Sequence, residues 1–197
     1  MHPRTLLLSS LLFLVPSLVR AQDLLSGPDV GQPVPGLSVL AATGSNAGNE
    51  IDYADQRKEK PTVYVFIQAD KWDRPVARFL SGLDEAMPKI SQEAYVVATW
   101  LTADQEKTKQ YLPVAQQSLR LANSALTQFT GASGPAAWKL HSGAHVTAVV
   151  VVKGTVAANF AYRSVNETVV HDVLVQVSRF SRGSFGQIEI GLHAKNG

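Results

Sequence analysis

Hydrophobic and polar residues fall into blocks along this chain, and the clearest boundary lies near residue 70. Residues 62–68 (TVYVFIQ) are mostly β-branched and aromatic, which is typical of a strand. Residues 69–72 form a polar turn, and Asp73 then precedes a helical pattern with Pro75 in its first turn. The pattern predicts a strand, a tight loop and a helix. In open α/β sheets, ligands usually bind at such a junction.

Two amphipathic helices are predicted by apolar positions spaced three and four residues apart. The first is expected over residues 74–92, with Asp73 as its N-cap, and Pro88 is expected to kink or shorten its last turns. The second is expected to begin at Asp104, with a kink or a break into two helices at Pro113. The apolar stripe of the first helix comprises Val76, Phe79, Leu80, Leu83, Met87 and Ile90.

Further strands are predicted by short runs rich in β-branched and aromatic residues. They comprise residues 37–41, 50–53, 95–101, 126–129, 146–152 and 156–162. The last two flank Lys153 and Gly154, which favour a tight turn, so they are expected to form an antiparallel hairpin. Together with the helices, this order predicts an α/β fold with a central mixed sheet flanked by helices.

The end of the chain has one more helical pattern. Residues 164–167 (SVNE) form a capping-box sequence, and the valines that follow recur at helical spacing up to Phe180. Residues 181–197 are rich in Gly and Ser and are expected to form a C-terminal tail. The globular domain is therefore expected to span residues 37–180.

The beginning of the chain predicts export. A basic start with Arg4, an apolar run and a small-residue cleavage pattern ending at Ala21 are typical of a secretory signal peptide. Removal of residues 1–21 would leave a secreted or periplasmic chain with no membrane span, and an uncleaved anchor is the alternative. Residues 22–36 are rich in Pro and Gly and are expected to be an N-terminal linker.

Charge and cysteine content exclude several classes of function. Residues 1–21 hold two of the 18 Lys and Arg residues and none of the 16 acids, so the mature chain is formally neutral. Nucleic-acid binding would require a basic stripe, which is not visible. The sequence has no cysteine, which excludes disulfides, thiolate catalysis and cysteine-ligated metal centres. No nucleotide-binding motif indicates a cofactor.

Three stretches are similar to a known family. They are Gly31-x-Pro33-x-Pro35 ahead of a short strand, PTVYVFIQAD followed by a helix that a proline opens, and VTAVVVVKGTVAANFAY with its Lys-Gly turn. In this order they resemble the thioredoxin superfamily, in its exported thioredoxin-like and peroxiredoxin-like (redoxin) branch. The resemblance spans residues 31–180. It implies a thioredoxin-like three-layer fold with an antiparallel hairpin and a C-terminal helix.

The chain departs from this superfamily at the positions that perform its chemistry. Lys71 and Arg74 stand where a thioredoxin-like protein would have Cys-x-x-Cys, and Pro75 stands where a peroxiredoxin would have its peroxide-reacting Cys. The cis-proline of the superfamily would fall near Val146, and the chain has no proline there. The resemblance therefore implies a scaffold without thiol oxidoreductase or peroxidase activity.

In such a fold, the loop after the central strand and the loop before residue 146 lie side by side at one end of the sheet. Trp and Arg often anchor interfaces, so the cleft between these loops is expected to bind an exported protein or an extended peptide. The alternative for single residues is structural, with Asp73 as a cap and Trp72 packed onto the loop. The candidate cleft comprises Asp70, Lys71, Trp72, Asp73, Arg74, His145 and Val146.

Two other functions use the same residues. A cysteine-independent enzyme would use a carboxylate of the cleft as general base, with its Lys, Arg or His stabilising charge. A metal site would combine His141 and His145 with these carboxylates, although the two histidines lie in a predicted loop and not on one helix face. The binding module is the prediction, with no catalytic residue and no metal ligand assigned.

Overall fold

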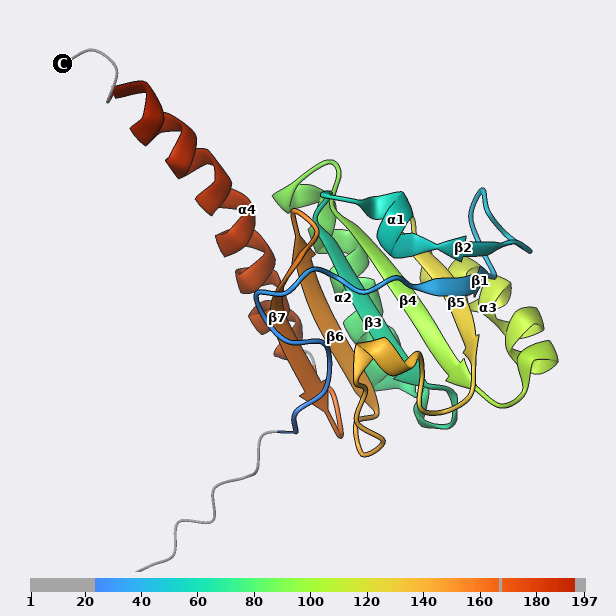
Figure 1. The fold of residues 1–197 in the computed structure, drawn as a ribbon. Helices are drawn as coiled ribbons and strands as arrows, with labels where there is room; N and C mark the ends of the chain where they lie inside the picture. Colours follow the sequence, from blue (N-terminus) through green and yellow to red (C-terminus); the bar gives the residue numbers. More distant parts are fainter. Residues whose placement is uncertain (1–23, 167, 194–197) are drawn as a thin grey trace, which may run out of the picture.

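The computed structural model describes residues 24–166 and 168–193, and its core is one seven-stranded sheet (Figure 1). The strands lie in the order β2-β1-β5-β4-β3-β6-β7. The strands are β1 (Ser38–Ala41), β2 (Glu50–Asp52), β3 (Thr62–Gln68), β4 (Tyr95–Thr102), β5 (Ser124–Thr130), β6 (Val146–Val152) and β7 (Thr155–Tyr162). The helices are α1 (Tyr53–Arg57), α2 (Arg74–Ile90), α3 (Gln105–Leu119) and α4 (Val169–His193), with 3₁₀ turns η1 (Ala69–Lys71) and η2 (Ala136–Trp138).

Strand β3 lies in the middle of the sheet. It pairs in parallel with β4, with Val65 opposite Ala98, and antiparallel with β6, which continues into β7 through the predicted hairpin. Strand β5 pairs in parallel with β4, and β1 and β2 are added antiparallel at the far edge. Residues 62–67 are all buried because layers cover both faces. The predicted central mixed sheet is confirmed.

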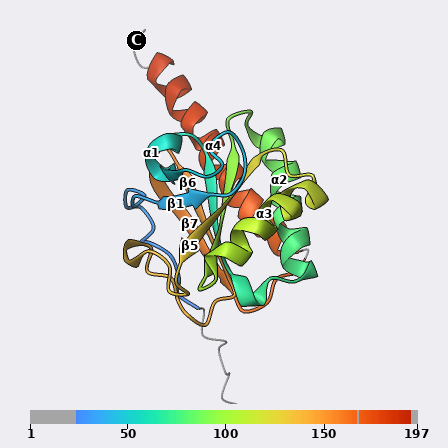
Figure 2. The ribbon, with the colours of Figure 1, turned by 90° about the vertical axis from the view of Figure 1, so that its right-hand side faces the viewer.

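The two faces of the sheet are covered differently (Figure 2). On one face, Val63 and Val65 belong to a core shared with α2, α3 and α4. On the other face, Tyr64 and Phe66 contact Trp138 of η2, with ring centroids 5.1 and 4.8 Å apart, and share a core with α1. The three layers therefore consist of three helices, the sheet, and a thinner layer of short helical turns and irregular segments.

Helix α2 confirms the predicted cap and stripe. The Asp73 carboxylate accepts a hydrogen bond from the Val76 backbone N–H at 2.9 Å, and Pro75 lies in the first turn. The apolar stripe is buried as far as Met87. Pro88 lies inside the last turn, and the helix ends soon after it.

Helix α3 begins after Asp104, whose carboxylate accepts from the Lys107 backbone N–H at 3.0 Å. The break predicted at Pro113 is wrong, because the helix runs continuously to its end. Leu112 and Ala115, on either side of the proline, are buried against the core. Tertiary packing of this face therefore maintains the helix across the proline.

The segment predicted as a linker, residues 22–36, is bound to the sheet from Ser26 onward. The Ser26 hydroxyl is buried and hydrogen-bonds the Thr147 hydroxyl at 2.7 Å. Residues 31–34 pair with the edge strand β7, and the Gly31 N–H donates to the Val156 carbonyl at 2.8 Å. An edge strand has unpaired backbone groups, and this segment supplies partners for part of β7.

Helix α4 begins at Val169, later than the capping-box sequence predicts. Asn166 accepts hydrogen bonds from the backbone N–H and the hydroxyl of Thr168, at 3.0 and 2.6 Å. Glu167, the acid of the predicted box, lies outside the described residues. The helix continues to His193, through much of the segment that composition predicts as a tail. Figure 1 shows its second half extending away from the sheet.

The predicted signal peptide, residues 1–21, lies outside the described residues. Within residues 24–166 and 168–193, none of the helices combines the length and the hydrophobicity needed to cross a membrane.

Candidate functional site

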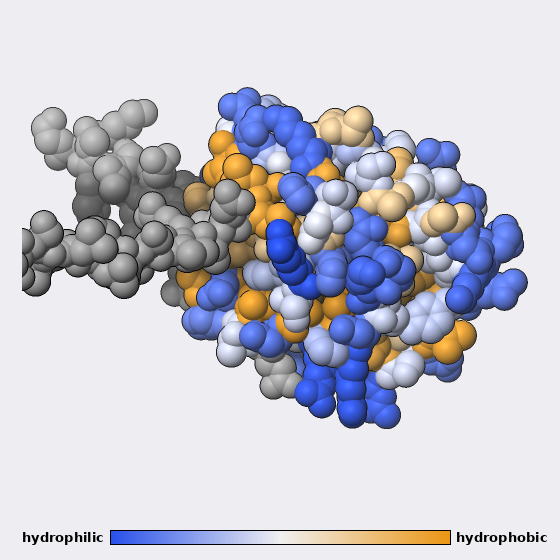
Figure 3. All heavy atoms as spheres, turned by 90° about the horizontal axis from the view of Figure 1, so that it is seen from below, coloured by the Kyte–Doolittle hydropathy of each residue, from blue (hydrophilic) through white to orange (hydrophobic). Residues whose placement is uncertain are grey.

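The predicted loop joins an inner strand to a helix. Strand β3 ends at Gln68, η1 follows, and α2 begins after Asp73. The Gln68 backbone N–H donates to the His145 carbonyl at 3.0 Å, which holds the two loops side by side at one end of the sheet. Figure 3, which views this end of the molecule, shows hydrophobic and hydrophilic residues interspersed over its surface.

Asp70 and Lys71 form an ion pair on the surface. The Lys71 ammonium lies 2.7 Å from the Asp70 carboxylate, and the two side chains are 44% and 70% exposed. The hydrogen bond from Lys71 lowers the pKa of Asp70 from its ordinary value. A carboxylate with a lowered pKa is a weak general base, so the ion pair of Asp70 with Lys71 does not favour the enzyme alternative.

Trp72 packs the loop onto the rest of the molecule. Its ring lies 4.8 Å from the ring of Trp100 in β4, at 56°. Its indole N–H donates to the Tyr111 hydroxyl at 2.7 Å, which ties the loop to α3. The indole has few free rotamers under these contacts, so its position is set before any partner arrives.

The remaining residues of the predicted cleft divide into three kinds. Asp73 caps α2, as described above, and Arg74 is exposed at the start of that helix. Val146 is fully buried, with its strand position opposite Ile67, so its side chain lies in the core and does not line a cleft. Val146 is the first residue of β6, so of the predicted cleft residues it is the one that the fold places inside the core.

His145 is partly buried, and both of its backbone groups are used within the domain. Its N–H donates to the Tyr162 carbonyl at 2.8 Å, and its carbonyl accepts from Gln68. A peptide that binds by adding a strand needs free backbone N–H and C=O groups. His145 does not offer them, so recognition here would depend on side chains.

The metal alternative gains no geometric support. His141 uses Nδ1 to accept a hydrogen bond from the Gly143 backbone N–H at 2.9 Å. In the part of the chain that the structure describes, no three His, Asp or Glu side chains group in a way that would hold a metal ion.

A hollow lies beside the loop after β3, on the side away from His145. It has a volume of about 570 Å³ and lies between η1, the end of β4 and the start of α3. Its rim comprises Gln68, Asp70, Thr102, Asp104 and Lys107, and Trp72, Trp100 and Tyr111 form an aromatic wall. Sequence reasoning missed the residues after β4. The parallel pairing of β3 with β4 could have identified these residues, because the carboxyl ends of parallel strands lie at the same edge of a sheet.

A second, smaller hollow of about 390 Å³ lies on the other side of the hydrogen-bonded pair Trp72 and Tyr111, which we call the aromatic bridge. Arg74, Val114 and Ser118 are among its lining residues. Tyr111 is 43% exposed and Val114 is 61% exposed, so both side chains are accessible to a partner. The two hollows and the aromatic bridge between them define one surface, which we call the Trp72–Tyr111 surface.

Comparison with solved structures places this fold among thioredoxin-like proteins. A protein of Chlorobium tepidum described as a thiol:disulfide interchange protein, DsbE, matches with a TM-score of 0.59 at 13% identity, over 76% of this chain and 96% of that one. Peroxidoxin BcpB from Mycobacterium tuberculosis matches with a TM-score of 0.56 at 13% identity, over 76% of this chain and 96% of that one. The exposed lipoprotein thioredoxin Etrx1 of Streptococcus pneumoniae strain TIGR4 matches with a TM-score of 0.52 at 10% identity, over 71% of this chain and 98% of that one. No protein-family model and no curated protein sequence matches the chain.

The predicted thioredoxin-like fold is confirmed, and identities this low establish the fold alone. The names of these structures refer to thiol chemistry. This chain has no cysteine anywhere in its 197 residues, so it cannot supply a thiol of its own.

Proposed function

We propose that this protein is an exported, redox-inactive thioredoxin-like module that binds a partner protein or peptide at the Trp72–Tyr111 surface. The observation that supports the proposal most directly is the aromatic bridge between two hollows, with the indole N–H of Trp72 bonded to Tyr111 at 2.7 Å. Trp and Tyr in a fixed position beside a hollow are the residue types that dominate binding energy at protein interfaces.

The mode of binding follows from the backbone. Because His145 uses its N–H and carbonyl inside the domain, strand addition at that loop is blocked. The Trp72–Tyr111 surface offers side chains that are exposed, apolar and held by α3 and β4. A partner would place its own apolar side chains in the two hollows, with Asp70, Arg74 and Lys107 at the edge.

Export is the second part of the proposal. It is supported by the basic start, the apolar run and the cleavage pattern of residues 1–21. N-terminal sequencing of the protein recovered from outside the cytoplasm should begin at Gln22. A chain that retains Met1 in the cytoplasmic fraction would contradict it.

The binding proposal is tested by capture from the exported fraction with the purified chain as bait. Val114→Arg places a charge on the Trp72–Tyr111 surface at a 61% exposed position, so it should abolish capture without unfolding the domain. Val175→Arg on α4 is the matched control, because Val175 is also exposed and lies elsewhere. Equal capture by all three proteins, or no specific capture by any, would overturn the proposal.

A further inference from the structure

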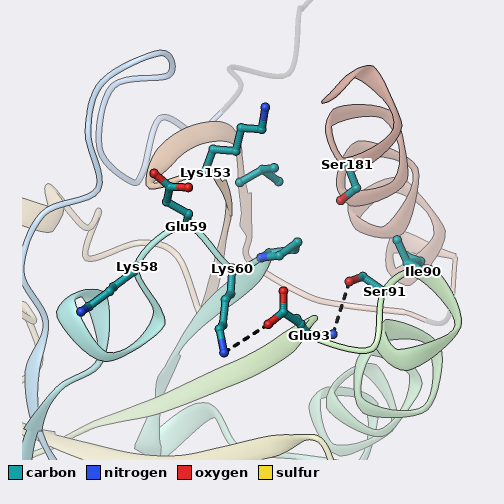
Figure 4. A pocket seen from close by; sticks show the side chains of 10 residues that line it. Lys58, Glu59, Lys60, Ile90, Ser91, Glu93, Lys153 and Ser181 are labelled. Carbon is teal, nitrogen blue, oxygen red and sulfur yellow. Dashed lines mark hydrogen bonds and ion pairs between the residues drawn. The ribbon is translucent and has the colours of Figure 1, made fainter. Parts of the chain in front are cut away.

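The opposite end of the sheet has a hollow that the proposed function does not use. It has a volume of about 740 Å³ and is larger than the hollow beside Trp72. Four parts of the chain form it: residues 58–61 before β3, the end of α2, the turn between β6 and β7, and α4 (Figure 4). The Lys153 backbone N–H donates to the Glu59 carbonyl at 3.0 Å, which joins two of these walls.

The floor of this hollow is apolar. It contains Pro61, Ile90 and Val152, which are at least partly buried. Small-molecule sites usually have volumes of about 300–1,000 Å³ and apolar walls with a few polar groups. The hollow therefore has the size and the lining of a site for a small molecule with an apolar body.

The rim has unpaired positive charge. Lys60 forms an ion pair with Glu93 at 3.2 Å, as Figure 4 shows. Lys58 and Lys153 have no ion pair within the described residues, and Glu59 is the remaining acid of the lining. A neighbouring hollow that shares Ile90 adds Arg179, and its Lys89 is already paired with Glu85. The excess is local, because residues 22–197 are formally neutral.

Ser181 adds a polar group without a partner. Its hydroxyl oxygen is inaccessible to solvent and has no hydrogen-bond partner among the described residues. Figure 4 shows this side chain directed from α4 toward the hollow. Because this oxygen is closed to solvent, a ligand in the hollow does not contact it, and the polar contacts to a ligand come from the rim.

We propose that this hollow binds a single-chain aliphatic amphiphile with a carboxylate head group, as in a fatty acid. The carboxylate lies near Lys153, and the hydrocarbon chain lies over Pro61, Val152 and Ile90. This orientation also keeps the head group away from the carboxyl end of α2 at Ile90, where the helix dipole is negative. The inference is independent of the Trp72–Tyr111 surface, because no residue lines both sites.

The test is a calorimetric titration of the full chain with three probes of equal chain length, each below its micelle concentration. The probes are dodecanoate, dodecan-1-ol and dodecyltrimethylammonium. Dodecanoate should bind most tightly, the alcohol more weakly, and the cation least. No binding of dodecanoate, or binding of the alcohol with equal affinity, would overturn the proposal.

Three variants locate the site. Lys153→Gln should weaken dodecanoate binding about two- to fivefold and leave the alcohol unchanged, since it removes one exposed charge contact. Ile90→Glu should weaken both probes by at least about tenfold, because a charge then lies in the apolar floor. Lys109→Gln is the matched control, an exposed lysine on α3 that should change nothing. Identical affinities for the Lys153 and Lys109 variants would show that the head group is not bound where we place it.

Discussion

Two aspartates of this protein, Asp84 and Asp70, show how differently the same side chain is used in two regions. Asp84, in the middle of α2, is 5% exposed, and its carboxylate accepts from the Ala122 N–H at 3.1 Å, the Asn123 N–H at 2.8 Å and the Ser124 hydroxyl at 2.5 Å. Asp70, in the loop before α2, is 70% exposed and pairs only with Lys71 among the described residues.

The Asp84 region stabilises the fold, whereas the Asp70 region leaves its polar groups accessible at the surface. A buried carboxylate is tolerated only when its oxygens are fully hydrogen-bonded, so the Asp84 region joins α2 to the start of β5 as one rigid unit. The Asp70 region leaves its polar groups in water, where a partner can replace the solvent at little cost. The Trp72–Tyr111 surface has its rigidity from packing of Trp72 against Trp100 and not from its charges.

The largest effect is expected from Asp84→Ala. It leaves two backbone N–H groups and the Ser124 hydroxyl without an acceptor in a buried position. At about 1–3 kcal/mol for each unsatisfied group, the free energy of unfolding should fall by about 3 kcal/mol or more, measured by urea denaturation. Asp84→Asn, which keeps an acceptor oxygen, should lose less. A loss below about 1 kcal/mol for the alanine variant would contradict the assigned role.

Trp72→Ala should have an intermediate effect on stability and a large one on binding. It removes the ring contact with Trp100 and the bond to Tyr111, which together are expected to contribute about 2 kcal/mol. Trp72→Phe keeps a ring and should lose about half of this. Capture of the partner should fail for the alanine variant even in conditions where circular dichroism shows it to be folded. Unchanged capture would place the binding surface elsewhere.

High pH should weaken the core through its buried tyrosines. Burial raises the pKa of the Tyr64 and Tyr162 hydroxyls above the ordinary value near 10. The folded state keeps these groups neutral, so their contribution is complete below about pH 10 and is lost as the pH rises toward the folded pKa values. Near pH 11 the free energy of unfolding should be lower by about 1 kcal/mol for Tyr64 alone. Tyrosinate absorbance in the folded protein at ordinary tyrosine pKa values for all five tyrosines would contradict this.

The smallest effect is expected from Asp70→Asn. Exposed ion pairs contribute about 0–1 kcal/mol, so the unfolding midpoint should move little and should become less sensitive to salt. If Asp70→Asn destabilised the domain as much as Asp84→Ala, the distinction between the two regions would fail. The two variants should therefore be measured in the same buffer.

Local chemistry was sufficient to predict several elements. The β-branched and aromatic run of residues 62–68 is β3 with the same bounds, and Asp73 caps α2. Lys153 and Gly154 both have positive φ in the hairpin turn, at 54° and 70°, which agrees with the turn that their sequence favours. These features depend on neighbours in the chain, so a short window of sequence contains the information.

Other features depend on residues that are distant in the chain. The contact of Trp72 with Tyr111, the packing of residues 26–34 against β6 and β7, and the bonds between Asp84 and residues 122–124 join segments that no local pattern relates. Pro113 was expected to kink α3 or break it into two helices, and no break occurs because burial of Leu112 and Ala115 outweighs its local preference. Val146 was included in the cleft because the cis-proline of the superfamily would fall near it, and only the structure shows that its side chain is buried in the core.

The sequence by itself determined the order of the main strands and helices, since hydrophobic periodicity specifies most of them, and it excluded thiol chemistry by the chain's own residues, since no cysteine is present. Only the tertiary structure decided where the hollows lie and which side chains line them. The reason is geometric: a hollow is the space that side chains from several elements leave unfilled, and its position is known only when those elements have been packed together.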